Sequence, residues 1–157
     1  MSAFRRFLLK VRGKDWICPE RLLAIDPGKT TGWALFVNGE LCDCGEIRNS
    51  SVKELEVLFN KVKPTVVVCE DYKVYAWKAA AHTWSDLPVS KLIGTIETLC
   101  YLRNAQFTTQ MAITGKMFCT NKRLEEWNIH VKGGHAEDAI RHGCYYLLFS
   151  NARVPKV

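Results

Sequence analysis

The sequence predicts an α/β domain built on a mixed five-stranded sheet, and three observations lead to this fold class. A continuously apolar run at residues 22–25 ends at Asp26 and is followed by Pro27 and Gly28, the pattern of a buried strand that ends in a turn. Two more strands follow through a hairpin, and a helix then precedes a β-branched run typical of a central strand. The length of 157 residues suits one such domain and is too short for two.

The first three strands are expected to run antiparallel to one another. Residues 22–25 form the first strand, residues 33–37 the second and residues 41–47 the third. The dipeptide Asn38-Gly39 lies between the second and the third, and it is a strong signal for a two-residue hairpin turn. A three-stranded antiparallel unit therefore opens the domain.

The residues before the first strand are basic. Their lysine and arginine side chains are interleaved with Phe4, Phe7 and Trp16. This segment suits an arm that lies along a phosphate backbone, and it suits equally an ordinary extension or an extra strand packed on the domain edge. We therefore divide the chain into a basic N-terminal extension, residues 1–20, and one folded domain, residues 21–157.

A helix and a fourth strand are expected after the antiparallel unit. Residues 51–54 form a capping box, and apolar residues at helical spacing continue to residue 62, just before Pro64. The β-branched run at residues 65–69 then predicts a central strand, which a crossover helix would make parallel to the first. This strand ends on Glu70 and Asp71.

Asp26 and Glu70 are expected at the ends of neighbouring parallel strands, at the sheet edge where ligands bind in open α/β sheets. Adjacent strands lie about 5 Å apart, so two carboxylates there repel each other unless a positive charge lies between them. A hard divalent cation such as Mg²⁺ or Mn²⁺, which prefers oxygen ligands, would supply that charge. Taken alone, Asp26 before Pro27 and Gly28 equally fits an ordinary turn.

Three further elements are expected to complete the domain. Apolar spacing predicts a helix over residues 90–104 and a fifth strand over residues 106–113, and the glycine pair at 133–134 opens the last helix. His135 and Asp138 are three residues apart in its first turn and share one face. The small and apolar residues that follow turn this face toward the protein, where a carboxylate needs a partner.

Basic and aromatic side chains flank these elements. A loop at residues 114–116 puts Lys116 within reach of a phosphate. A short helix over residues 117–127 carries Lys122 and Arg123, whose position suits substrate contact, although solvated basic side chains are commoner. The segment just past Glu70 adds further candidates: Tyr72, Lys73, Tyr75 and Trp77. Their composition suits stacking on unpaired bases and contact with phosphates, although the aromatic rings equally suit packing under the loop.

The composition indicates which kinds of partner and which cellular compartment suit this protein. A formal charge of +6 and a pI near 9.0 indicate a polyanionic partner, most commonly nucleic acid, although an anionic membrane surface or simple solubility also fits. The seven cysteines include no CxxC pair, which disfavours a structural zinc site and favours a reducing cytosol. Because no segment has the apolar length to span a bilayer, we expect a cytoplasmic protein without a membrane partner.

Four motifs resemble, in order and spacing, those of RuvC-like Holliday junction resolvases, especially the phage-type enzymes. They are IDPGKTTGWA around Asp26, VVVCED with Glu70, the helical SKLIGTIETL, and HAEDA with His135 and Asp138. The resemblance covers about residues 21–150. It implies a ribonuclease H-like fold, an α/β arrangement in which helices flank a five-stranded mixed sheet whose first three strands are antiparallel.

The resemblance also implies an activity and a site. It suggests a crossover junction endodeoxyribonuclease that resolves Holliday junctions by two-metal phosphodiester hydrolysis, with two Mg²⁺ or Mn²⁺ ions. Other branched DNA is a further candidate substrate. Asp26, Glu70 and Asp138 match the metal-binding catalytic acids. His135 stands where relatives carry Asp or His, as a metal ligand or as a proton carrier. A homodimer is expected, because a junction with two-fold symmetry requires two symmetrical nicks.

Other positions match the family less closely. Lys116 corresponds to a phosphate-contacting lysine, and Lys29 of the first motif is a further candidate for nucleic-acid binding. The segment before the last helix is shorter than in bacterial resolvases, and residues 1–20 have no counterpart. Two other functions fit parts of the pattern: a non-catalytic module that binds branched DNA, and an actin-like or sugar-kinase-like nucleotide-binding fragment, whose second lobe this length cannot hold.

Overall fold

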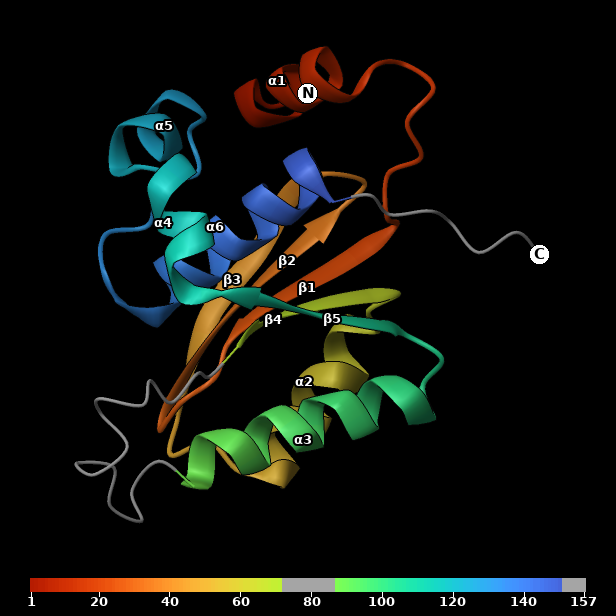
Figure 1. Ribbon diagram of the computed structural model, residues 1–157, viewed down its shortest axis with the longest axis vertical. Coiled ribbons are helices and arrows are strands. Elements are labelled where there is room, and N and C mark those ends of the chain that lie inside the picture. Colours follow the sequence, from red (N-terminus) through yellow and green to blue (C-terminus); the bar gives the residue numbers. More distant parts are fainter. Residues whose placement is uncertain (72–86, 151–157) are drawn as a thin grey trace.

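The computed structural model describes residues 1–71 and 87–150, and it contains a five-stranded sheet with the strand order β3-β2-β1-β4-β5 (Figure 1). Its strands are β1 (Arg21–Asp26), β2 (Thr30–Val37), β3 (Glu40–Arg48), β4 (Val66–Asp71) and β5 (Gln106–Met111). β2 pairs antiparallel with β1 and β3, whereas β4 pairs parallel with β1 and β5. The predicted mixed sheet, with its first three strands antiparallel, is confirmed.

Helices cover both faces of the sheet. Those in the described residues are α1 (Ala3–Arg12), α2 (Val52–Val62), α3 (Leu87–Leu102), α4 (Ala112–Phe118), α5 (Asn121–Glu126) and α6 (Gly134–Phe149). Figure 1 shows α2 and α3 on one face, and α6 on the other with α1, α4 and α5 around it. Within the described ranges, no helix combines the length and apolar content needed to cross a bilayer.

The alternation of side chains along β1 divides the core into two layers. Leu23 and Ile25 pack in the cluster that α2 and α3 complete. Leu22 and Ala24 pack in the cluster on the α6 face. Because strand side chains alternate with a period of two residues, Asp26 continues the second series and faces α6. The same hydrophobic pattern that builds the core therefore points this carboxylate at one particular helix.

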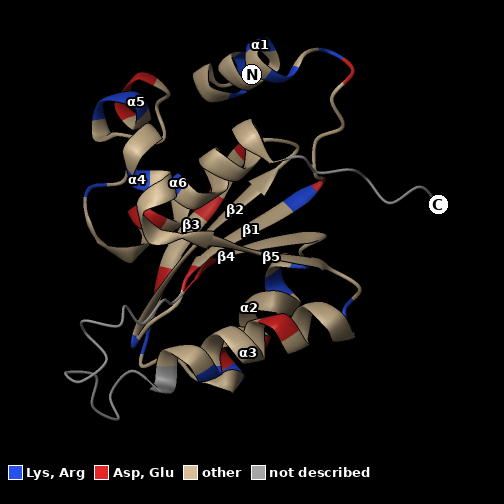
Figure 2. Cartoon of the chain, viewed as in Figure 1, with Lys and Arg blue, Asp and Glu red and all other residues tan. Residues whose placement is uncertain are grey.

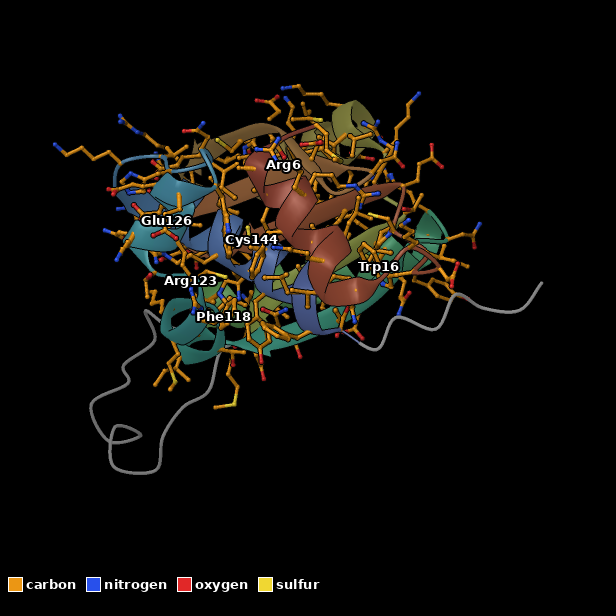
Figure 3. All side chains as sticks on the ribbon, turned by 90° about the horizontal axis from the view of Figure 1, so that it is seen from above. Arg6, Trp16, Phe118, Arg123, Glu126 and Cys144 are labelled. Atoms are coloured by element: carbon orange, nitrogen blue, oxygen red, sulfur yellow. The ribbon has the colours of Figure 1, made fainter. Side chains whose placement is uncertain are left out.

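The basic segment at the N-terminus contains a helix, α1, in place of the extra strand that was one alternative from the sequence. Its Phe4 and Leu8 are fully buried, and the Phe4 ring lies 5.1 Å from the Trp127 ring, centroid to centroid. Figure 3 shows α1 lying over α6. Arg12 donates a hydrogen bond of 2.8 Å to the carbonyl oxygen of Leu147 on α6. This helix thus shares the core of the α6 face.

The region after β5 differs from the prediction. The strand ends at Met111, and α4 begins at the next residue, so Lys116 lies in a helix and not in a loop. The single helix predicted over residues 117–127 is divided between α4 and α5, because the Thr120 hydroxyl caps α5 by accepting from the Arg123 N–H. The apolar residues after Met111 fit the pattern of a strand that continues. Packing against α6 distinguishes the helix from such a strand.

α3 also differs in its bounds from the predicted helix at residues 90–104. It starts earlier, at Leu87, and ends at Leu102. Asn104 has a φ of 53°, a left-handed conformation that helical residues do not adopt and that asparagine tolerates at the end of a helix. The apolar pattern therefore located the helix, and the left-handed asparagine sets its end.

A close approach between β2 and the first turn of α6 fixes the helix on the sheet. A Cβ atom placed on Gly32 would lie 2.0 Å from the carbonyl oxygen of His135, where no side chain fits. The backbones of the strand and the helix are therefore in direct contact at this point. Since Gly32 pairs with Asp26 across the β1–β2 ladder, the contact also sets the height of α6 above the acidic end of β1.

We expect Gly32→Ala to lower the free energy of unfolding by at least about 2 kcal/mol, because the added methyl group must displace the first turn of α6. Urea denaturation measures the change. Gly94→Ala is the matched control: Gly94 lies within α3 with open space around its Cβ position, so alanine there should stabilise the protein by about 0.5–1 kcal/mol. Equal stability of wild type and Gly32→Ala would contradict the close contact.

Candidate active site

One row of residues crosses all five strands on the α6 face. Gly32 of β2 pairs with Glu46 of β3 and with Asp26 of β1, and Glu70 of β4 pairs with Gln110 of β5. Asp26 and Glu70 each follow the last paired position of the parallel strands β1 and β4. The two carboxylates therefore end neighbouring strands at the same edge, as the sequence predicts. Figure 2 marks the acidic end of β4 in red near the middle of the sheet.

The first turn of α6 lies over the Asp26 half of this row. The Nδ1 atom of His135 is 2.8 Å from Asp26 Oδ2, and the His135 backbone N–H donates a 2.8 Å hydrogen bond to Glu46 Oε1. Gly133 and Gly134, with φ of 71° and 85°, make the sharp entry into the helix that residues with side chains rarely adopt. His135 is thus held over this half of the row through its ring, which contacts Asp26, and through its backbone, which contacts Glu46.

The third turn of α6 lies over the other half of the row. His142 is buried, its Nε2 atom is 2.9 Å from Glu70 Oε2, and its Nδ1 atom is 3.0 Å from Gln110 Oε1. Sequence reasoning assigned no role to His142, Gln110 or Glu46. The available signals were the spacing of His142, seven residues after His135 on one helical face, and the strand alternation that aligns Gln110 with Glu70.

Asp138 lies between the two histidines along α6, and it contacts a lysine. Its Oδ2 atom is 3.0 Å from Lys116 Nζ, and its Oδ1 atom is 3.6 Å from Arg141 Nε. The hydrogen bond to Asp138 is the main reason that the pKa of Lys116 is raised above its ordinary value. α4 can reach α6 because a Cβ on Gly115 would already lie 3.3 Å from the Arg141 backbone. The structure thus brings Asp138 and Lys116 to the same place.

The two strand-end carboxylates have opposite pKa shifts. Burial, followed by the negative charge of Glu70, raises the pKa of Asp26 to about 6, against the opposing effect of His135. Burial also acts to raise the pKa of Glu70, but the hydrogen bond and charge of His142, together with Lys116, outweigh it and lower that pKa. Of the two acids, Asp26 therefore holds a proton more readily, which is the expected result of crowding two carboxylates.

The donor atoms of this cluster fit a hard divalent cation. Asp26, Glu70 and Asp138 supply carboxylate oxygens and His135 an imidazole, and the raised pKa of Asp26 marks a place where an added positive charge is favourable. In the described part of the chain, no three His, Cys, Asp or Glu side chains already form a group that could hold a metal ion. In this conformation Lys116 contacts Asp138, and His135 and His142 contact Asp26 and Glu70.

The residues predicted to contact nucleic acid lie in different surroundings in the structure. Lys29 is exposed in the turn that follows Asp26, and Lys122 is exposed on α5. Arg123 instead packs at the corner between α4 and α5, where its guanidinium lies 3.9 Å over the Phe118 ring (Figure 3). The remaining predicted residues lie outside the described ranges: Tyr72, Lys73, Tyr75 and Trp77.

The fold is that of known Holliday junction resolvases. RuvC of Thermus thermophilus, in a complex with a Holliday junction substrate, superposes with a TM-score of 0.64 at 13% identity, over 82% of this chain and 92% of that one. The Fowlpox virus resolvase, in a complex with Holliday junction DNA, gives 0.55 at 15% identity, over 80% and 97%. The yeast mitochondrial resolvase Ydc2 gives 0.58 at 13% identity, over 91% and 86%. No family model matches the sequence, and neither does any curated protein.

At these identities the likeness concerns the fold. The predicted ribonuclease H-like arrangement, and the resemblance in fold to RuvC-like resolvases, are confirmed.

The charge on Asp26 should cost stability at neutral pH in the absence of divalent ions. Its pKa is about 6 when folded, against 3.8 as the ordinary value, so between these values the folded state keeps a proton that the unfolded state releases. Stability is therefore lost as the pH rises through this window. The advantage of Asp26→Asn over wild type in urea unfolding should be about 1 kcal/mol larger at pH 7 than at pH 5.

The matched control is Asp43→Asn, at an exposed aspartate of β3 that pairs with Lys61. Its difference from wild type should change less between the two pH values. A pH-independent difference between Asp26→Asn and wild type would show that Asp26 and Glu70 do not share one crowded site.

Proposed function

We propose that this protein is a metal-dependent, structure-selective endodeoxyribonuclease that cleaves four-way junctions and other branched DNA. One observation supports the proposal: Asp26 and Glu70 lie at the ends of neighbouring strands, His135 of α6 lies 2.8 Å from Asp26, and the charge of Asp138 of α6 acts on the same carboxylate. Solved structures with the same fold include resolvases in complexes with Holliday junction DNA. Four acid or imidazole groups on a fold used for this reaction favour hydrolysis of a phosphodiester.

Asp26, Glu70, Asp138 and His135 are the residues that would hold two Mg²⁺ or Mn²⁺ ions. The chemistry such ions supply when bound is activation of the attacking water and stabilisation of the leaving 3′ oxygen. The protein's own part is to hold carboxylates on rigid strand and helix positions. Lys116, whose amine lies 3.0 Å from Asp138, is the group placed to contact a DNA phosphate at the acidic site.

The remaining features suit a branched DNA partner. The formal charge of +6 favours binding to a polyanion, and Lys29 lies exposed at the same sheet edge as the acids. Tyr72, Lys73, Tyr75 and Trp77 follow β4 in the sequence and are proposed contacts to unstacked bases and phosphates. Two symmetrical nicks in one junction require two sites, so we propose that the active form is a homodimer.

With Mg²⁺ or Mn²⁺, the purified wild type should nick a labelled synthetic four-way junction and leave a duplex of matched sequence intact. Asp26→Asn should lower the rate by at least about 100-fold, because loss of a metal ligand costs more than loss of an outer-shell contact. Asp43→Asn, the same exchange at an exposed site, should cleave like wild type. Junction binding without nicking in either metal would instead indicate a non-catalytic binding module.

Lys116→Ala should have opposite effects on two measurements. Without DNA, calorimetry should show Mn²⁺ binding about two- to fivefold tighter, because a competing positive charge at a partly exposed pair is removed. With DNA, the rate of junction cleavage should fall at least about tenfold, because a phosphate contact is lost. Lys61→Ala removes a lysine that lies 3.0 Å from Asp43, away from the site, and should change neither value. Weaker Mn²⁺ binding by Lys116→Ala would contradict the competition.

A further inference from the structure

We propose that His142 is a positioning residue that holds the Glu70 carboxylate in its working orientation through a hydrogen bond. This role rests on the function proposed above. Neither the sequence motifs nor the fold comparison assigns a role to His142. His142 belongs to α6, whereas Glu70 is the next-to-last residue of β4, so the contact joins two elements that are far apart in the sequence.

The burial of His142 requires partners for its ring. Only 1% of the residue is exposed, and a buried imidazole nitrogen without a hydrogen bond is costly. Both nitrogens have partners: Nε2 lies 2.9 Å from Glu70 Oε2 and donates to it, and Nδ1 lies 3.0 Å from Oε1 of the Gln110 amide. These are normal hydrogen-bond distances. With the Nε2–H tautomer, the Gln110 amide turned by 180° donates its NH₂ group to Nδ1. The ring is therefore held at both ends.

The two partners are themselves fixed relative to each other. Glu70 and Gln110 are paired positions of the parallel strands β4 and β5. A ring inserted from α6 between two side chains of adjacent strands has little freedom to turn. The Glu70 carboxylate of β4 is consequently tied through Oε2 to α6, and through the ring of His142 to β5, which is the arrangement that orients a ligand for a metal ion.

The position of His142 on α6 distinguishes it from a histidine that only fills the core. It lies four residues after Asp138 and seven after His135, so all three point from one face of the helix. The neighbours at 139, 140 and 144 are buried apolar residues of the core cluster. A polar residue at this place has partners because Glu70 of β4 and Gln110 of β5 lie opposite.

Three substitutions at His142 distinguish the effect of the hydrogen bond to Glu70 from the effect of the hydrogen bond to Gln110. His142→Gln keeps a side-chain amide nitrogen at the position of Nε2 and can still donate to Glu70. His142→Asn keeps one at the position of Nδ1 and reaches Gln110 instead. His142→Leu fills a similar volume and supports neither bond. Because Gln and Asn are both polar amides, a purely structural need for a buried polar group does not predict that Asn is the worse of the two.

The first readout is Mn²⁺ affinity of the free protein, measured by calorimetry or by electron paramagnetic resonance. We expect His142→Leu and His142→Asn to bind Mn²⁺ about 10–100-fold more weakly than wild type, and His142→Gln to stay within about threefold. In junction cleavage, kcat should fall in the same order while KM stays close to the wild-type value. Equal losses for Asn and Gln, or wild-type affinity in His142→Leu, would overturn the proposal.

A measurement on the wild type keeps the test open if His142→Leu does not fold. The Nε2–H proton of a buried ring bound to a carboxylate should appear in NMR spectra as a slowly exchanging, downfield resonance, and rapid exchange would count against the proposal. The two proposals can also fail separately. If wild type binds Mn²⁺ but leaves junctions intact, the nuclease function is wrong, and the order of Mn²⁺ affinities still decides the role of His142.

Discussion

The structure depends on neutralising two carboxylates that neighbouring strands present on the same face of a sheet. Asp26 and Glu70 cannot be moved apart, because the hydrophobic alternation of β1 and β4 and the pairing of the strands fix both positions. Burial makes their charges costly. Whatever packs over them must therefore bring positive or hydrogen-bonding groups, and α6 does so with one histidine for each acid. The packing of α6 on the sheet therefore forms the core and the candidate site together.

The close contact of backbones makes this arrangement rigid. α6 touches β2 at Gly32 and α4 at Gly115, and in both places a Cβ atom would already be too close or in tight contact. A helix clamped on both sides cannot rotate without losing its packing. The polar residues on its inner face, His135, Asp138 and His142, are therefore held at fixed heights above the strand ends. This suits a site in which ligand atoms must keep their positions.

Local sequence patterns predicted the strands, their pairing and the shared edge of Asp26 and Glu70, because a period of two residues and a hairpin turn are local signals. The same patterns predict a loop at Lys116, because the apolar residues after Met111 continue the strand pattern and the helix depends on contact with α6. No local pattern indicates a role for His142 or Gln110, for a related reason. Their roles depend on the rotation of α6 about its axis relative to the sheet register, and that rotation is set by tertiary packing at Gly32 and Gly115.

Burial divides the cluster into a fixed part and an exchangeable part. The His142–Glu70 contact is inaccessible on the histidine side, with a side-chain exposure of 1%, so breaking it would leave a buried group without a partner, at a cost of about 1–3 kcal/mol. The Lys116–Asp138 pair has side-chain exposures of 54% and 26%, and such pairs contribute about 0–1 kcal/mol. A lysine held this weakly can leave Asp138 for a phosphate at little cost. In the proposed enzyme, Glu70 is therefore the constant ligand, and Asp138 is the acid released when the substrate arrives.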